Sequence, residues 1–126
     1  MRVLLDTVTF IRSIQSPEHI SLRAMDVLKH EDTVRELSAI SVSEIAIKNS
    51  VGKLDLSRED VHTGIADLQI RVIPYTVDHA SFLFGLPLHH RDPFDRMLIA
   101  QAAAEGMVIV TDDVRLSLYD VPLLRN

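Results

Sequence analysis

Four acidic residues lie far apart in this chain, and their positions place them at one edge of a predicted sheet. Asp6, Glu44 and Asp113 each follow a short strand-like run, and Asp95 lies in the first turn of a predicted helix that leads into the strand before Asp113. The carboxyl ends of parallel strands share one edge of an open α/β sheet, so these acids are expected to converge there. Clustered carboxylates repel one another unless they are protonated or share a cation, so the pattern indicates a divalent metal site.

The ligand types restrict the choice of metal. A site built only from carboxylate oxygens favours the hard cations Mg²⁺ and Mn²⁺ over zinc, as one ion or as two. The chain has no cysteine. That excludes thiolate catalysis, disulfide bonds and zinc sites built on sulfur.

Several of the acids also have a structural explanation. Glu44 stands three residues after Ser41, which matches a capping box, and four residues before Lys48, which suits a helix surface pair. Asp92 is placed to cap the helix that contains Asp95. We assign Asp92 to capping and Asp95 to chemistry, because the helix phase turns Asp95 toward the strand ends.

The polar residues near these acids are the next candidates. Asp112 and Asp113 form a pair after the same strand, and one of them could be an ordinary turn acid. The pair His89-His90 is predicted to face solvent in a loop. Four basic residues lie within a few residues or one helical turn of a candidate acid, which indicates phosphate recognition. They are Arg12, Lys48, Arg91 and Arg96.

Short strand-like runs alternate with helical patterns along the chain, which is typical of βαβ units and a parallel sheet. The predicted strands span residues 2–5, 37–40, 71–73, 108–111 and 121–124, the last at a sheet edge because it contains a proline. The predicted helices begin near Ser16-Pro17, at Ser41, after Ser57, near Thr76 and at Pro93. We therefore predict one α/β domain over residues 1–126.

The composition is that of a globular domain. The chain has 126 residues, of which 47% are hydrophobic, and a net charge of −5. Because four of the acids are candidate metal ligands, this acidity is weak evidence against a polynucleotide substrate. No basic flank precedes a long apolar stretch, so we expect no secretory signal, no membrane association and a cytoplasmic location.

Four ordered motifs resemble those of PIN-domain ribonucleases of the VapC toxin type. They are Leu4-Leu5-Asp6-Thr7, then 43–48 followed by Gly52-Lys53-Leu54, then 89–102, and finally Val110-Thr111-Asp112-Asp113. The resemblance covers essentially the whole chain, and the segment 90–102 is its most specific part. One departure lies in the first motif, where Val8 and Arg12 stand in place of the His and Trp that relatives often have.

This resemblance implies a three-layer α/β/α domain around a mainly parallel sheet of about five strands. It implies a ribonuclease in which Asp6, Glu44, Asp95 and Asp113 bind Mg²⁺ or Mn²⁺. It also implies a homodimer, a cognate antitoxin and a structured RNA substrate such as transfer RNA. We assign substrate contacts to Thr7, Arg12, Lys48, Arg91, Arg96 and Thr111, with Asp112 and Asp92 as second choices for the acids.

Two other functions are compatible with the same residues. A phosphotransferase with Asp6 as its nucleophile is disfavoured. Such enzymes have an Asp-x-Asp motif, and Val8 stands here at the position of the second aspartate. The main alternative is a catalytically silent binding module that docks a partner protein or RNA.

Overall fold

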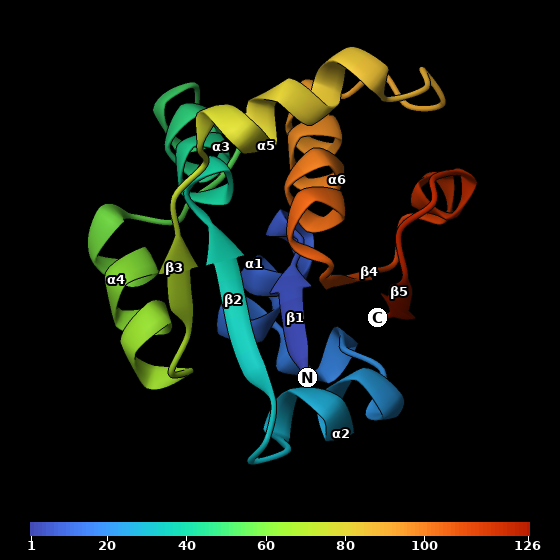
Figure 1. Ribbon diagram of the computed structural model, residues 1–126. Helices are drawn as coiled ribbons and strands as arrows, with labels where there is room; N and C mark the ends of the chain where they lie inside the picture. The colour runs from blue at the N-terminus through green and yellow to red at the C-terminus, as the bar shows by residue number, and fades with distance from the viewer.

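A computed structural model describes residues 1–126, and its centre is a five-stranded sheet with every neighbouring pair of strands parallel (Figure 1). The strand order is β3-β2-β1-β4-β5, which puts β1 in the middle and β5 at an edge, as predicted. The last strand was predicted over 121–124 with a proline inside it, but β5 begins at Leu123, after Pro122. The strands are β1 (Arg2–Leu5), β2 (Val34–Ser38), β3 (Arg71–Ile73), β4 (Val108–Thr111) and β5 (Leu123–Arg125).

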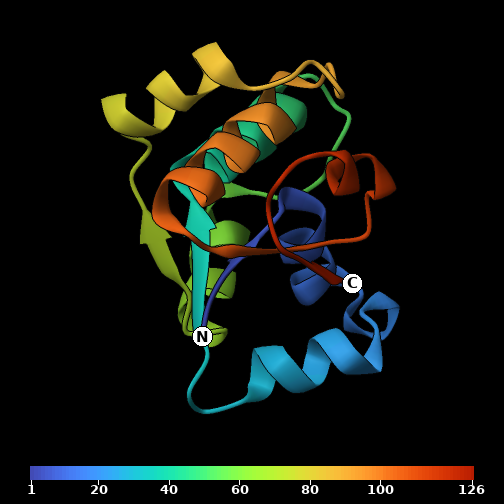
Figure 2. The ribbon, with the colours of Figure 1, turned by 45° about the vertical axis from the view of Figure 1, so that its right-hand side comes forward.

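Helices cover both faces of this sheet (Figure 2). They are α1 (Thr7–Gln15), α2 (Leu22–Lys29), α3 (Ala39–Ser50), α4 (Arg58–Asp67), α5 (Val77–Ser81) and α6 (Pro93–Glu105), with 3₁₀ turns η1 (Pro17–His19), η2 (Phe82–Gly85) and η3 (Val114–Leu118). Val3 and Leu5 of β1 belong to a core with residues of α1, α2 and α4, whereas Leu4 belongs to a second core with residues of α6. The predicted three-layer α/β/α architecture is confirmed.

The first helix differs from the sequence prediction. The helix that we predicted from Ser16-Pro17 is present as α2, but it begins later, at Leu22, and Pro17 opens only the short turn η1. We did not predict α1, which begins at Thr7. Asp6 caps α1 by accepting a hydrogen bond from the Thr9 amide at 2.8 Å. The β-branched residues after Asp6 have low helix propensity, which concealed the helix that this cap begins.

The second strand lies earlier than predicted, at residues 34–38 and not 37–40. Ser38 caps α3, because its hydroxyl accepts from the Ile40 amide at 3.1 Å, so the expected strand end is helical. Ser41 is therefore a buried residue inside α3, and the predicted capping box of Ser41 with Glu44 is wrong.

The element that carries Asp95 agrees with its prediction. Asp92 caps α6 by accepting from the amides of Phe94 and Asp95, and Pro93 is its first residue. Gly106 ends the helix in the left-handed conformation, which glycine adopts at low cost. No helix has both the length and the apolar character required to cross a membrane.

Candidate metal centre

Asp6 lies between the central strand and α1. Its amide donates to Val110 O of β4 at 3.1 Å, and its side chain is buried beneath the sheet edge. Burial raises the pKa of Asp6, while hydrogen bonds with Thr111 and Thr9 lower it and the charge of Asp112 raises it further. The ionised form of a carboxylate buried in this way is favoured by a cation nearby.

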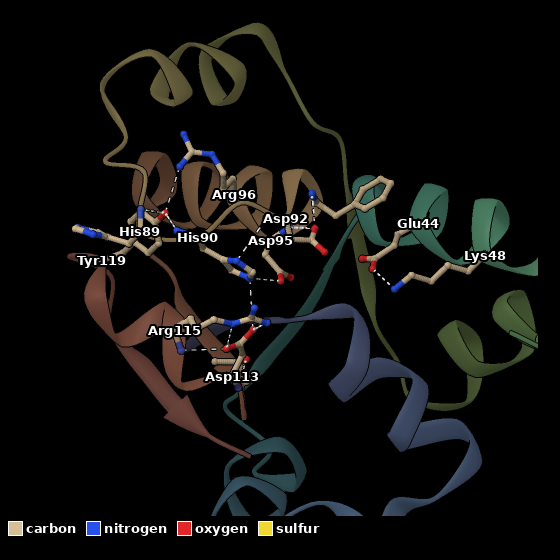
Figure 3. A network of polar contacts seen from close by, with 12 residues as sticks. Glu44, Lys48, His89, His90, Asp92, Asp95, Arg96, Asp113, Arg115 and Tyr119 are labelled. Carbon is tan, nitrogen blue, oxygen red and sulfur yellow. Dashed lines mark hydrogen bonds and ion pairs between the residues drawn. The ribbon is translucent and has the colours of Figure 1, made fainter. Parts of the chain in front are cut away.

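Glu44 approaches the same edge from α3 and is only 5% exposed. Its Oε2 accepts a hydrogen bond from Lys48 Nζ at 2.7 Å, which confirms the predicted pair along the helix. Its Oε1 is buried and has no hydrogen-bond partner. An unsatisfied buried acceptor costs about 1–3 kcal/mol, and more when it is charged. Figure 3 shows this carboxylate directed toward the start of α6, where Asp92 and Asp95 lie.

Asp95 is a second carboxyl of the site whose pKa is raised. Burial raises its pKa to about 6; the hydrogen bond and charge of His90 act in the opposite sense, and the charges of Asp92 and Glu44 raise it. The contribution of Glu44 indicates that α3 and the start of α6 present their acids to a common region. Burial and mutual repulsion are the two usual causes of such a rise at functional sites.

His90 joins two of the predicted acids. Its Nε2 lies 2.8 Å from Asp95 Oδ2 and 3.5 Å from Asp113 Oδ2 (Figure 3). The candidate ligand atoms of these three residues all lie within 4.8 Å of one another. His90 is only 5% exposed, so the prediction that it faces solvent is wrong, whereas His89 is exposed.

Asp113 rather than Asp112 lies beside Asp95. Asp113 caps η3, and both of its oxygens also accept from Arg115, from Nε at 3.0 Å and from Nη2 at 2.8 Å. These bonds hold the pKa of Asp113 below its ordinary value. Asp112 instead accepts from Arg12 Nη1 at 2.6 Å.

The basic residues that we predicted to bind substrate lie near the acids, with the exception of Arg96. Lys48 and Arg12 each pair with a carboxylate at the site, and Arg91 is exposed with no ion pair. Arg96 instead points away from the acids and donates to Pro87 O, Leu86 O and the Tyr119 hydroxyl (Figure 3). These contacts indicate that Arg96 positions the loop before α6, and they disfavour the predicted contact between Arg96 and a phosphate.

The two threonines are internal. The Thr7 hydroxyl donates to Ser41 Oγ at 2.9 Å, and Thr111 Oγ1 accepts from the Asp113 amide at 3.0 Å. Both side chains are buried and do not face solvent; Thr111 positions Asp113 through its amide, whereas Thr7 links α1 to α3 through Ser41.

The donor set fits a divalent cation. It consists mainly of carboxylate oxygens, and one of these, Glu44 Oε1, is a buried acceptor without a donor. Of the four predicted acids, only Asp95 and Asp113 belong to the group around His90, and Asp6 and Glu44 lie outside it. His90 and Arg115 were not predicted as site residues.

Comparison with known proteins identifies the fold family. Residues 3–122 match the sequence model of the PIN domain. The chain belongs to the PIN-domain family. This membership confirms the resemblance that the sequence motifs suggested. Among curated protein sequences, none matches this PIN domain.

Solved structures share the PIN fold over nearly the whole chain. VapBC2 from Rickettsia felis, bound to a promoter DNA fragment, has a TM-score of 0.76 and 15% identity, covering 99% of this chain and 98% of that one. DNA-bound VapBC from Salmonella typhimurium has a TM-score of 0.71 and 16% identity, with coverages of 99% and 98%. FitAcB from Neisseria gonorrhoeae has a TM-score of 0.59 and 21% identity, with coverages of 97% and 96%.

Proposed function

We propose that this PIN domain is a metal-dependent ribonuclease and the toxin of a toxin–antitoxin pair. Membership in the PIN family supports this proposal, as do Asp95 and Asp113, which lie together at His90. The observation that carries it is the buried, unpartnered Oε1 of Glu44, directed toward the region where Asp95 lies. A divalent cation bound there would satisfy this oxygen and favour the ionised form of Asp95, whose pKa is raised by burial and, to a smaller extent, by the charges of Asp92 and Glu44.

Asp6, Glu44, Asp95 and Asp113 would hold Mg²⁺ or Mn²⁺, as one ion or as two. When bound, the cation supplies an acidified water and positive charge against the phosphate oxygens. The protein side chains hold the cation and orient the substrate. Asp6 and Glu44 are buried and presented by the end of β1 and by α3, so they are held in place before substrate arrives.

The phosphate contacts are assigned to basic residues that remain accessible near the acids. Lys48 forms an ion pair with Glu44, and Arg91 is exposed one residue before the cap of α6. Arg12 forms an ion pair with Asp112 at the other side of the site. Guanidinium and ammonium groups at these positions would orient an RNA backbone across the carboxylates.

The neighbouring structures support one of the proposed partners, an antitoxin. Several of them are VapBC or FitAB complexes, and one is described as a member of the VapBC family of toxin-antitoxin systems. We propose a cognate antitoxin for this chain, a homodimeric state, and RNA as substrate, with transfer RNA as the first class to examine.

The test is cleavage of total cellular RNA by the purified protein, with Mg²⁺ or Mn²⁺ and with chelator. Asp6→Asn and Glu44→Gln are assayed beside the exposed control Asp120→Asn. Asparagine is also a good helix cap, so Asp6→Asn preserves the start of α1. Discrete, metal-dependent products that disappear in the two site variants alone support the nuclease. A folded, metal-binding wild type without products favours the binding module instead.

A further inference from the structure

His90 occupies an unusual position for a residue in an irregular segment. The residues from Pro87 to Arg91 are exposed except for His90, which is buried between the start of α6 and the end of β4. An imidazole is rarely buried without a polar partner on each ring nitrogen. Both nitrogens of His90 have one, and they set its orientation.

The backbone of this segment is held from a distant part of the chain. The Tyr119 hydroxyl, buried beyond η3, accepts from the amides of His89 at 3.0 Å and His90 at 2.9 Å. Arg96 donates to the same hydroxyl at 3.2 Å and to Pro87 O at 2.9 Å. Figure 3 shows Tyr119 and Arg96 on the side of His90 opposite the acids. The loop is therefore fixed before any ligand binds.

The ring contacts determine which nitrogen carries the proton. The Asp92 amide points at His90 Nδ1 from 3.5 Å, which leaves Nδ1 as the acceptor. Nε2 then carries the proton and donates to Asp95 Oδ2 at 2.8 Å, with Asp113 Oδ2 at 3.5 Å. One N–H group thus lies between carboxylates that come from different elements of the fold.

We propose that His90 is a positioning residue of the metal centre. Its Nε2–H fixes the rotamer of Asp95 and leaves the other oxygen of that carboxylate available to a cation. The same N–H group also holds the Asp113 carboxylate close to that of Asp95. The inference rests on the proposed function, because it assigns His90 a role toward the cation that the four acids would hold. Outer partners of this kind typically change metal affinity by about 10- to 100-fold when removed.

The experiment compares two substitutions of similar size at this position. His90→Gln keeps an N–H donor near the position of Nε2, and His90→Met fills the same space without a donor. Mn²⁺ is titrated calorimetrically into wild type and each variant, after thermal unfolding has confirmed that they are folded. His89→Ala, which removes the neighbouring exposed imidazole, is the control.

We expect His90→Met to weaken Mn²⁺ binding by about tenfold or more. His90→Gln and His89→Ala are expected to stay within about threefold of wild type, because both keep the donor to Asp95. Equal affinity of the Met and Gln variants overturns the positioning role, even where RNA cleavage stands. A wild type that binds no Mn²⁺ instead removes the metal centre itself, and with it both the proposed function and the role of His90.

Tyr119→Phe tests the same role from the other end of the contact. It retains the buried ring and removes only the hydroxyl that accepts from the His90 amide. We expect weaker Mn²⁺ binding than wild type, in the same direction as His90→Met. Unchanged affinity in Tyr119→Phe excludes the hydroxyl as the support of the His90 loop.

Discussion

Lys48 donates to only one oxygen of Glu44, at 2.7 Å, and leaves the other oxygen buried without a partner. Because a bound cation would satisfy that oxygen in the folded state alone, Mn²⁺ should stabilise the protein. A hundredfold excess over Kd corresponds to about 2.7 kcal/mol of unfolding free energy. Urea unfolding with and without Mn²⁺ measures this gain. Glu44→Gln should lose most of it, whereas Glu31→Gln, an exposed turn residue, should keep it. An equal gain in both variants contradicts a role for Glu44 in holding the cation.

The raised pKa of Asp95 predicts a pH-dependent stability. Its folded pKa is about 6 against an ordinary value of 3.8, so the folded state binds the proton more tightly than the unfolded chain. The stabilisation from this group is present below pH 4 and is lost as the pH rises through 6. Because solvent reaches part of the group, we expect a change of about 1–2 kcal/mol. Asp95→Asn should flatten this part of the stability profile measured by urea unfolding from pH 4 to 8.

The same protonation competes with the cation. Below pH 6, Mn²⁺ must displace a proton from Asp95, so the apparent Kd should weaken by up to about tenfold per pH unit. Above pH 6 the contribution of Asp95 should level off. Calorimetric titrations in two buffers of different ionisation enthalpy count the protons released. Zero release near pH 6 contradicts the assignment of Asp95 as a ligand.

Much of the fold and of the site's location was predictable from local patterns. Asp6 and Asp113 follow runs whose length and apolar character define buried parallel strands, and such strands bring their ends to one edge. The cap at Asp92 was predictable because capping is a local interaction. The start of α1 was not, since the low helix propensity of Thr7, Val8 and Thr9 outweighed the cap that Asp6 provides.

The missed residues depend on contacts across the chain. His90 is buried because its amide is bound by Tyr119, 29 residues later, and no local periodicity encodes that bond. Its position two residues before the Asp92 cap was the only signal in the sequence. The pairing of Arg115 with Asp113 is local, and the acid-x-base spacing after a strand offered a signal for it. The ligand roles of the four acids remain predictions.

Arg115 is expected to compete with the cation for Asp113. Its guanidinium already engages both oxygens of that carboxylate and is itself exposed, so it can swing aside toward solvent. Arg115→Ala should therefore tighten Mn²⁺ binding by roughly two- to fivefold, the usual strength of an exposed ion pair. The exposed Arg23→Ala is the matched control. Weaker binding in Arg115→Ala shows instead that the arginine holds Asp113 in its ligating orientation.

The proposed homodimer predicts a phenotype for an exposed aromatic residue. Phe84 in η2 is 97% exposed, and Phe82, Val77 and Leu88 nearby are also exposed. An apolar patch of this kind is typical of a protein interface. Burying a phenylalanine is worth about 1.5–3 kcal/mol, so Phe84→Asp should weaken dimerisation by about tenfold or more without destabilising the monomer.

Leu22→Asp provides the matched control for this substitution, because Leu22 is 85% exposed but lies in α2, away from η2. Sedimentation velocity over a range of protein concentrations should show a dissociated Phe84→Asp and a dimeric Leu22→Asp. The reverse result places the interface at α2. A wild type that stays monomeric at all concentrations removes the homodimer from the proposal and leaves the exposed patch of η2 to another partner.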